Sequence, residues 1–201
     1  MELIEPVKGL PDMVFATDCS IVVGDKVLLS NFRFPQRRPE TAVFESWFRE
    51  KGYEDIKQTA HFFEGGGDIL AFGNKFIAGH GFRTDIAAHK ELRDYFGRDV
   101  ISLRIVDPHF YHLDTSLAVL GDDTVAYFPG AIDKDSRLQL RRHVPNLIEA
   151  TLEEAMGFGL NAVSDGRNVI CSDESPSLLG KYKSAGFNVI GTPILEFRTS
   201  G

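Results

Sequence analysis

Four short hairpin signals recur along the 201-residue chain at a nearly constant interval. In each of them two apolar runs flank a glycine with Asp or Asn, the residues that supply the positive φ of two-residue hairpin turns. The turn glycines are Gly24, Gly73, Gly121 and Gly166, with spacings of 49, 48 and 45 residues. Such a period is typical of a fold that repeats one supersecondary unit.

A helix and a short strand are expected after each hairpin. Helical patterns run over 39–52 and 84–97, start again near Asp135, and run over 174–186, and the strands follow near 55–56, 100–103, 147–148 and 189–190. Thr84 and Asp85 could cap the second helix. We therefore predict one α/β domain over 1–201, built from repeats at about 16–58, 62–106, 110–150 and 159–195. Residues 1–7 are expected to form a strand of an incomplete fifth unit.

A hairpin with one helix cannot bury its own apolar face, so the units should pack around a shared axis. We expect the hairpins inside and the helices outside. The period alone does not distinguish a closed ring from an open stack. An open ring would expose strand edges and apolar surface, which favours a homodimer.

The composition excludes several classes of protein. Hydrophobic residues make up 43% of the chain and charged residues 25%, which is ordinary for a globular domain. The net charge of −7 argues against nucleic acid or an anionic membrane as the partner. No apolar run approaches the roughly 20 residues of a membrane span, and no signal-peptide pattern is visible. We predict a cytoplasmic protein, and the two cysteines are too few for a disulfide framework.

Ionisable residues fall at nearly the same position of three repeats, where the first strand of each hairpin is expected to begin. The residues are Asp18, then Glu64 and Asp68 around a glycine triplet, then His112 and Asp114, whereas the fourth repeat has Asn161. On a strand, His112 and Asp114 would point to the same face. Converging carboxylates with one imidazole suit a cationic substrate and acid–base chemistry.

Structural alternatives exist for each of these features. An Asp beside a turn can simply cap it, and a glycine triplet can be a bend rather than a close approach to a ligand or strand. The His-x-Asp pair could begin a metal site, but no third N or S ligand is visible in the sequence. The functional interpretation therefore rests on the shared repeat position.

Three segments, Phe63–Asp68, Phe110–Thr115 and Pro11–Asp18, resemble the guanidino-group-modifying superfamily. Its members include arginine deiminase, dimethylarginine dimethylaminohydrolase and amidinotransferases. The stretches 106–130 and 157–166 are most similar to its bacterial dimethylargininase-like and arginine-hydrolysing branch. The resemblance implies a pentein-like α/β propeller of five ββαβ blades, of which about four are present here.

The resemblance also implies a mechanism in which a cysteine thiolate attacks the guanidinium carbon. A protonated histidine helps the amine to leave, and the covalent amidino intermediate is then hydrolysed. By motif match, His112 and Glu64 are the expected catalytic residues, and the expected substrate-binding residues are Asp18, Asp114, Arg83, Arg37 and Asp68. The two arginines would bind a substrate carboxylate, although Arg37 could equally be a solvated surface charge. No metal or organic cofactor is implied, because a thiolate and an imidazole suffice.

The nucleophile expected from the resemblance follows a glycine-rich loop, and residues 193–201 lead up to that loop. We therefore expect the cysteine beyond Gly201, and we expect Cys19 and Cys171 to be structural. The predicted function is hydrolysis of arginine or N-methylated arginine to citrulline with ammonia or an alkylamine. This chain alone should bind a guanidinium without completing turnover. Two alternatives stay open: a non-catalytic guanidino-binding or interaction module, and an amidinotransferase.

Overall fold

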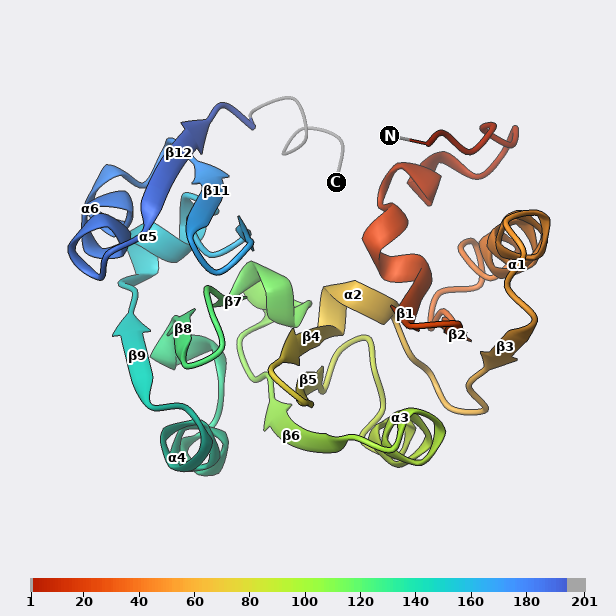
Figure 1. Cartoon of the computed structure of the whole chain (residues 1–201), viewed down its shortest axis with the longest axis horizontal. Helices are drawn as coiled ribbons and strands as arrows, with labels where there is room; N and C mark the ends of the chain where they lie inside the picture. The colour runs from red at the N-terminus through yellow and green to blue at the C-terminus, as the bar shows by residue number, and fades with distance from the viewer. Residues whose placement is uncertain (1, 195–201) are drawn as a thin grey trace.

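The computed structural model describes residues 2–194, which contain four three-stranded sheets that follow one another along an arc (Figure 1). The strands are β1 (Ser20–Val23), β2 (Lys26–Leu29) and β3 (Asp55–Gln58); β4 (Ile69–Phe72), β5 (Lys75–His80) and β6 (Asp99–Arg104); β7 (Leu117–Val119), β8 (Thr124–Tyr127) and β9 (Asn146–Glu149); β10 (Val163–Ser164), β11 (Asn168–Ser172) and β12 (Asn188–Thr192). In every sheet the first two strands are an antiparallel hairpin and the third is parallel to the second.

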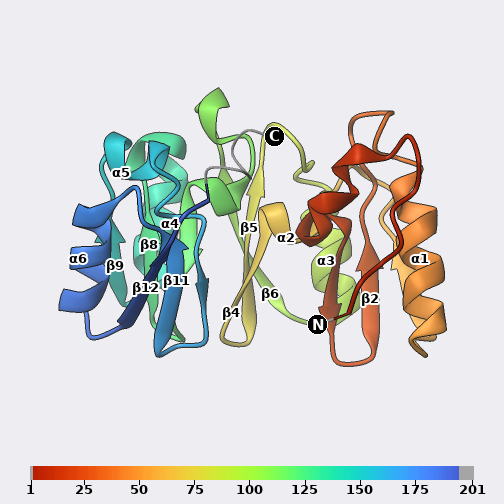
Figure 2. The same ribbon diagram turned by 90° about the horizontal axis from the view of Figure 1, so that it is seen from above.

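One long helix connects the second and third strands of each sheet and lies on the outer side of the arc (Figures 1 and 2). These helices are α1 (Glu40–Glu50), α3 (Ala88–Phe96), α4 (Lys134–His143) and α6 (Pro176–Ser184). The expected ββαβ unit and the α/β propeller class are therefore confirmed. Residues 1 and 195, the outermost positions of the expected units, lie outside the described residues.

Two of the four expected hairpin turns have the predicted length. Gly24 and Gly73 begin two-residue turns with φ of 61° and 53°. The third turn has four residues, 120–123, and Gly121 does not adopt a positive φ. The fourth has three residues, because the side chain of Asp165 accepts hydrogen bonds from the backbone N–H groups of Arg167 and Asn168 and widens the turn.

Other local predictions need correction. The second long helix begins at Ala88 rather than beside Thr84, because the Thr84 hydroxyl accepts the N–H of Glu64 instead of capping. Helix α5 (Leu152–Met156) was not expected, although its Thr151–Glu154 capping box is visible in the sequence. Residues 2–7 do not form the expected strand, because their backbone groups pair with no other strand of the described chain.

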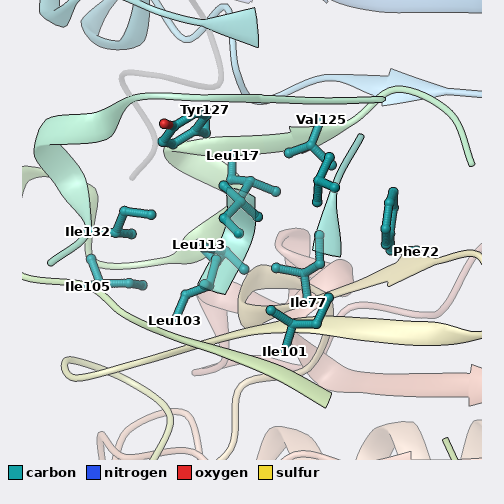
Figure 3. Close-up of a cluster of buried hydrophobic side chains, with 12 residues drawn as sticks. Phe72, Ile77, Ile101, Leu103, Ile105, Leu113, Leu117, Val125, Tyr127 and Ile132 are labelled. Carbon is teal, nitrogen blue, oxygen red and sulfur yellow. The ribbon is translucent and has the colours of Figure 1, made fainter. Parts of the chain in front are cut away.

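Three hydrophobic cores lie between consecutive sheets of the described chain, and a fourth lies between the first sheet and α1. The core between the second and third sheets contains Ile77 and Leu103 on one side and Leu117, Val125 and Tyr127 on the other (Figure 3). Successive residues of a middle strand point to opposite faces and so enter different cores. In β5, for example, Ile77 enters this core, whereas its neighbours Phe76 and Ala78 enter the core shared with the first sheet.

The far face of the fourth sheet is exposed in the described chain. Val163, Ile170 and Ile190 are neighbours across β10, β11 and β12, and their exposed fractions are 74%, 45% and 48%. None of the helices among residues 2–194 is long and apolar enough to cross a membrane.

Candidate active site

A pocket of about 580 Å³ opens where the four hairpins begin, a size that suits a small ligand. Its walls come from the segments that precede β1, β7 and β10, from the loops that follow β2 and β5, and from Ile194 after β12. The lining residues are Asp12, Phe15, Thr17, Asp18, Phe34, Gln36, Arg37, Arg83, Tyr111, His112, Asp114, Thr115, Phe158, Asn161 and Ile194. All four repeats therefore contribute to one site.

The segments that carry the ionisable groups are short helical turns rather than the expected strands. Asp18 lies in the 3-10 turn η2 (Ala16–Cys19), Glu64 precedes the single-turn helix α2 (Gly65–Asp68), and His112 precedes the 3-10 turn η4 (Leu113–Thr115). Backbone hydrogen bonds such as Ser116 N–H to the Leu113 carbonyl close these turns. The expectation that His112 and Asp114 share one face of a strand is therefore wrong, although both line the pocket.

Glu64 lies behind His112 and Arg83 rather than in the pocket wall. One carboxylate oxygen of Glu64 lies 2.9 Å from Nε2 of His112 and also 2.9 Å from Nη1 of Arg83, while the other accepts the backbone N–H of Arg33. Glu64 is fully buried, and His112 is 7% exposed. The carboxylate therefore fixes the orientation of the imidazole and of the guanidinium that face the pocket.

The charge environment keeps His112 protonated at neutral pH. Burial alone would lower its pKa, but the hydrogen bond to Glu64 and the negative charges of Asp68, Asp18 and Asp114 raise the pKa to about 9. For the acidic Glu64 burial acts in the opposite direction and would raise the pKa. The hydrogen bond and charge of His112 and the charge of Arg83 nevertheless hold this pKa below its usual value. An imidazolium that is hydrogen-bonded to an ionised carboxylate and lines the pocket is suited to donate a proton to a ligand.

Asp114 and Asp68 differ in their access to the pocket. Asp114 lines it, and burial raises the pKa of this carboxyl group to about 7 although the charge of His112 opposes the shift. Asp68 is not part of the wall: it is 1% exposed, and its Oδ1 accepts the backbone N–H of Leu113. Burial raises the pKa of Asp68 to about 6. Its position next to the His112 segment supports a role in positioning that segment.

Arg37 belongs to a buried ion network. Its Nη1 donates to Asp18 at 2.8 Å and its Nη2 to Glu40 at 2.9 Å, and the residue is 5% exposed. Its guanidinium also stacks on the ring of Phe32, 4.3 Å from the centroid. The alternative that the sequence left open, a solvated surface charge, is therefore wrong. Arg37 is held by Glu40 and in turn fixes the carboxylate of Asp18 in the pocket wall.

The glycine triplet brings the turn segments into contact. A Cβ on Gly65 would lie 2.7 Å from the carbonyl oxygen of Asp18, and Gly65 has a φ of +32°. A Cβ on Gly67 would clash with Oδ1 of Asp18 and lie 3.1 Å from Cγ of His112. The triplet is thus required for a close approach between segments of the site, one of the two uses that its sequence suggested.

Replacing Gly67 by alanine should therefore displace Asp18 and His112. We expect a loss of stability of about 1–3 kcal/mol from overpacking. We also expect at least about tenfold weaker binding of a guanidinium ligand, since a hydrogen bond to a charged group contributes roughly 1.5–3 kcal/mol. Urea unfolding and calorimetry would measure the two effects. The matched control is Gly180→Ala in α6, where no atom lies within 4 Å of the added Cβ. Equal behaviour of the two variants would contradict the packing argument.

Neither cysteine lines the pocket. Cys19 packs in the core of the first sheet and Cys171 in the core between the third and fourth sheets. Burial raises the pKa of each thiol to about 11, which disfavours the nucleophilic thiolate. The segment 195–201, in which the sequence places the approach to the nucleophile, lies outside the described residues. Among residues 2–194, no group of three or more His, Cys, Asp or Glu side chains is arranged to hold a metal ion.

The sequence interpretation missed several residues of the wall. Phe34 and Tyr111 both contact the Arg83 guanidinium, with ring centroids 4.7 and 4.5 Å from its Cζ. Asp12 adds a further carboxylate, and its position within the Pro11–Asp18 motif could have indicated it. Tyr111 likewise lies within the Phe110–Thr115 motif, whereas Phe34 is a single aromatic residue in a loop and carries no periodic signal.

The sheet order and the His–Glu pair beside a carboxylate-lined pocket agree with the class that the sequence resembles, the guanidino-group-modifying superfamily. More narrowly, residues 3–159 match the family model described as arginine deiminase. The chain therefore belongs to the arginine deiminase family.

Similar proteins include enzymes of arginine metabolism. The chain is 42% identical over 201 residues to the N(G),N(G)-dimethylarginine dimethylaminohydrolase of Mycobacterium tuberculosis, and the match covers 100% of this chain and 66% of that protein. It is 36% identical over 207 residues to the bifunctional arginine dihydrolase/ornithine cyclodeaminase ArgZ of Synechocystis sp., with 100% of this chain and 29% of that protein covered. The chain thus spans less than two thirds of the length of either relative.

Solved structures agree with the fold. The N-terminal domain of ArgZ bound to substrate, described as an arginine dihydrolase, superposes with a TM-score of 0.94 at 35% identity, covering 100% of this chain and 76% of that one. A dimethylarginine dimethylaminohydrolase in an adduct with S-methyl-L-thiocitrulline superposes with a TM-score of 0.81 at 22% identity, covering 96% of this chain and 74% of that one. The second comparison supports the fold alone.

Proposed function

We propose that the pocket binds the guanidinium group of arginine or an N-methylated arginine and serves hydrolysis of its C–N bond. The observation that carries the proposal is the His112–Glu64 pair, which faces a pocket that Asp18 and Asp114 also line. Carboxylates match the fork geometry of a guanidinium, and an imidazolium can protonate the departing amine. The arginine and dimethylarginine chemistry of the relatives supports the same substrate class.

In the proposed reaction a cysteine thiolate attacks the guanidinium carbon, and His112 donates its proton to the nitrogen of the C–N bond that breaks. Ammonia or an alkylamine leaves, and an amidino thioester-like intermediate remains. Neutral His112 then takes one proton from water as the oxygen attacks the same carbon. The C–S bond breaks to release the thiolate, and the second proton of the water passes to solvent as citrulline forms. The buried Cys19 and Cys171 are poorly placed for the first step. His112, the carboxylates and Arg83 supply binding and proton transfer.

Binding of L-arginine to this chain tests the proposal by calorimetry. At pH 8, above the Asp114 pKa of about 7, Asp114→Asn removes one pocket charge and should weaken binding at least about tenfold, because a charge-assisted hydrogen bond contributes roughly 1.5–3 kcal/mol. L-Citrulline, with a neutral ureido group, is the matched control ligand and should bind more weakly than L-arginine. Equal affinity for the two ligands, or binding that Asp114→Asn leaves unchanged, would contradict guanidinium recognition.

Turnover distinguishes the alternatives. A hydrolase releases citrulline without an added amine, an amidinotransferase requires an amine acceptor such as ornithine or glycine, and a binding module gives no turnover. Citrulline released by this chain in a Cys19→Ser/Cys171→Ser variant would show that another group acts as the nucleophile. A homodimer and a cytoplasmic location stay predictions from the sequence.

A further inference from the structure

Arg83 lies at the pocket and contacts two aromatic rings that come from different repeats. Phe34 follows β2, Arg83 follows β5, and Tyr111 directly precedes His112. The Cζ atom of Arg83 is 4.7 Å from the ring centroid of Phe34 and 4.5 Å from that of Tyr111. Phe34 is 41% exposed and Tyr111 is 40% exposed. Arg83 thus makes two cation–π contacts at the pocket wall.

Polar contacts fix the remaining freedom of Arg83. Its Nη1 donates to Glu64 at 2.9 Å, and its backbone carbonyl accepts a hydrogen bond from Nε of Arg33 at 3.3 Å. Arg33 is in turn paired with Asp85 at 2.5 Å. The bond to Glu64 uses one of the five N–H donors of the guanidinium, and the side chain is 18% exposed. Arg83 can therefore be held in place and still present donors to a ligand.

We propose that Phe34 and Tyr111 are positioning residues: they hold the Arg83 guanidinium in one plane at the pocket, where it selects ligands that carry a carboxylate. This inference rests on the proposed function, in which Arg83 binds the carboxylate of an arginine substrate. A free arginine side chain loses much rotamer entropy when it binds a ligand. Two rings that restrict it beforehand reduce that loss, and a cation–π contact contributes about 0.5–2 kcal/mol.

A simpler role for the rings would be contact with the hydrocarbon part of the ligand. The two roles differ in the ligands that they affect. A ring that touches the ligand's methylene groups would matter equally for L-arginine and for agmatine, which is arginine without its carboxylate. A ring that positions Arg83 would matter for L-arginine alone.

The experiment compares the affinities of both ligands for the wild-type chain and for Phe34→Ala, Tyr111→Ala and Tyr111→Phe. Each alanine variant should weaken L-arginine binding by about 2- to 30-fold, the range of one cation–π contact, and leave agmatine within about twofold. Tyr111→Phe keeps the ring and should restore the wild-type affinity. In an Arg83→Ala background, Tyr111→Ala should have no further effect. Equal weakening of both ligands, unchanged L-arginine affinity, or additive effects would overturn the proposal.

The Arg83 side chain offers a measurement that needs no ligand. Its Nε–H signal in a 15N correlation spectrum should exchange slowly with water in the wild type and in Tyr111→Phe, and faster in Tyr111→Ala and Phe34→Ala. If the wild type bound neither ligand, the proposed function would fail, and the selectivity would fail with it. An Nε–H signal that exchanges equally fast in all four proteins would overturn the clamp itself, even if guanidinium binding were observed.

Discussion

Replacement of Arg37 by methionine is expected to lower the free energy of unfolding by about 3–5 kcal/mol, the usual cost of removing one partner from a buried ion pair. The variant would leave Asp18 and Glu40, which are 4% and 1% exposed, without the guanidinium that both contact. Burial already raises the pKa of Glu40 although Arg37 opposes the shift, so the loss of Arg37 should raise it further. Urea unfolding at pH 7 would measure the effect.

The matched control for this prediction is Arg49→Met. Arg49 pairs with Glu45 at 2.7 Å, but the two side chains are 53% and 40% exposed. Exposed pairs of this kind contribute at most about 1 kcal/mol. A loss in Arg37→Met no larger than in the control would show that the network is not stabilising.

In Arg37→Lys, the ratio of L-arginine to agmatine affinity should match the wild type if Arg37 does not touch the ligand carboxylate.

The free energy of unfolding is expected to fall by about 2 kcal/mol as the pH rises from 7 to 9, because of His112. The pKa of this imidazole is raised to about 9 in the folded chain, and its ordinary value is 6.5. The folded state therefore binds more protons than the unfolded state over this interval, by somewhat less than one proton on average. The stabilisation is complete below the unfolded pKa and is lost as the pH passes through the folded pKa.

Other acidic groups around the imidazole titrate at lower pH. The raised pKa values of Asp68 and Asp114, about 6 and about 7, also make the folded state bind extra protons, but this stabilisation is lost mostly below pH 7. In His112→Gln the decline between pH 7 and 9 should be much smaller, because only the part due to Asp114 and the two buried thiols remains. His143→Gln, on the exposed side of α4, is the control for removal of one imidazole. An unchanged decline in His112→Gln would assign the titration to another group.

Much of the fold could be predicted because its signals are periodic. The hairpin glycines located all four sheets. Apolar spacing located α1, and a proline near the start with a glycine at the end located α6, both to within a few residues. The single-turn helices before β1, β4 and β7 could not be predicted in this way. A turn of three or four residues is shorter than one helical period, so apolar spacing contains no information about it.

The candidate site could be predicted in its membership more than in its arrangement. Asp18, His112 and Asp114 line one pocket, as the shared repeat position implied. The burial of each site residue could not be predicted from the sequence, because it depends on partners that are distant in the chain. Arg37 is buried by a carboxylate 19 residues earlier, and Glu64 is screened from the pocket by His112, 48 residues later.

The alternation of core residues along the middle strands also has a consequence for cooperativity. In β8, Val125 and Tyr127 belong to the core on one side and Ala126 to the core on the other. Unfolding of the third sheet would thus expose both cores at once, and its two neighbours would each lose a packing partner. Local fluctuations in such a chain are coupled between adjacent sheets. Since every sheet contributes to the pocket wall, a bound ligand would bridge segments that otherwise communicate only through their nearest neighbours.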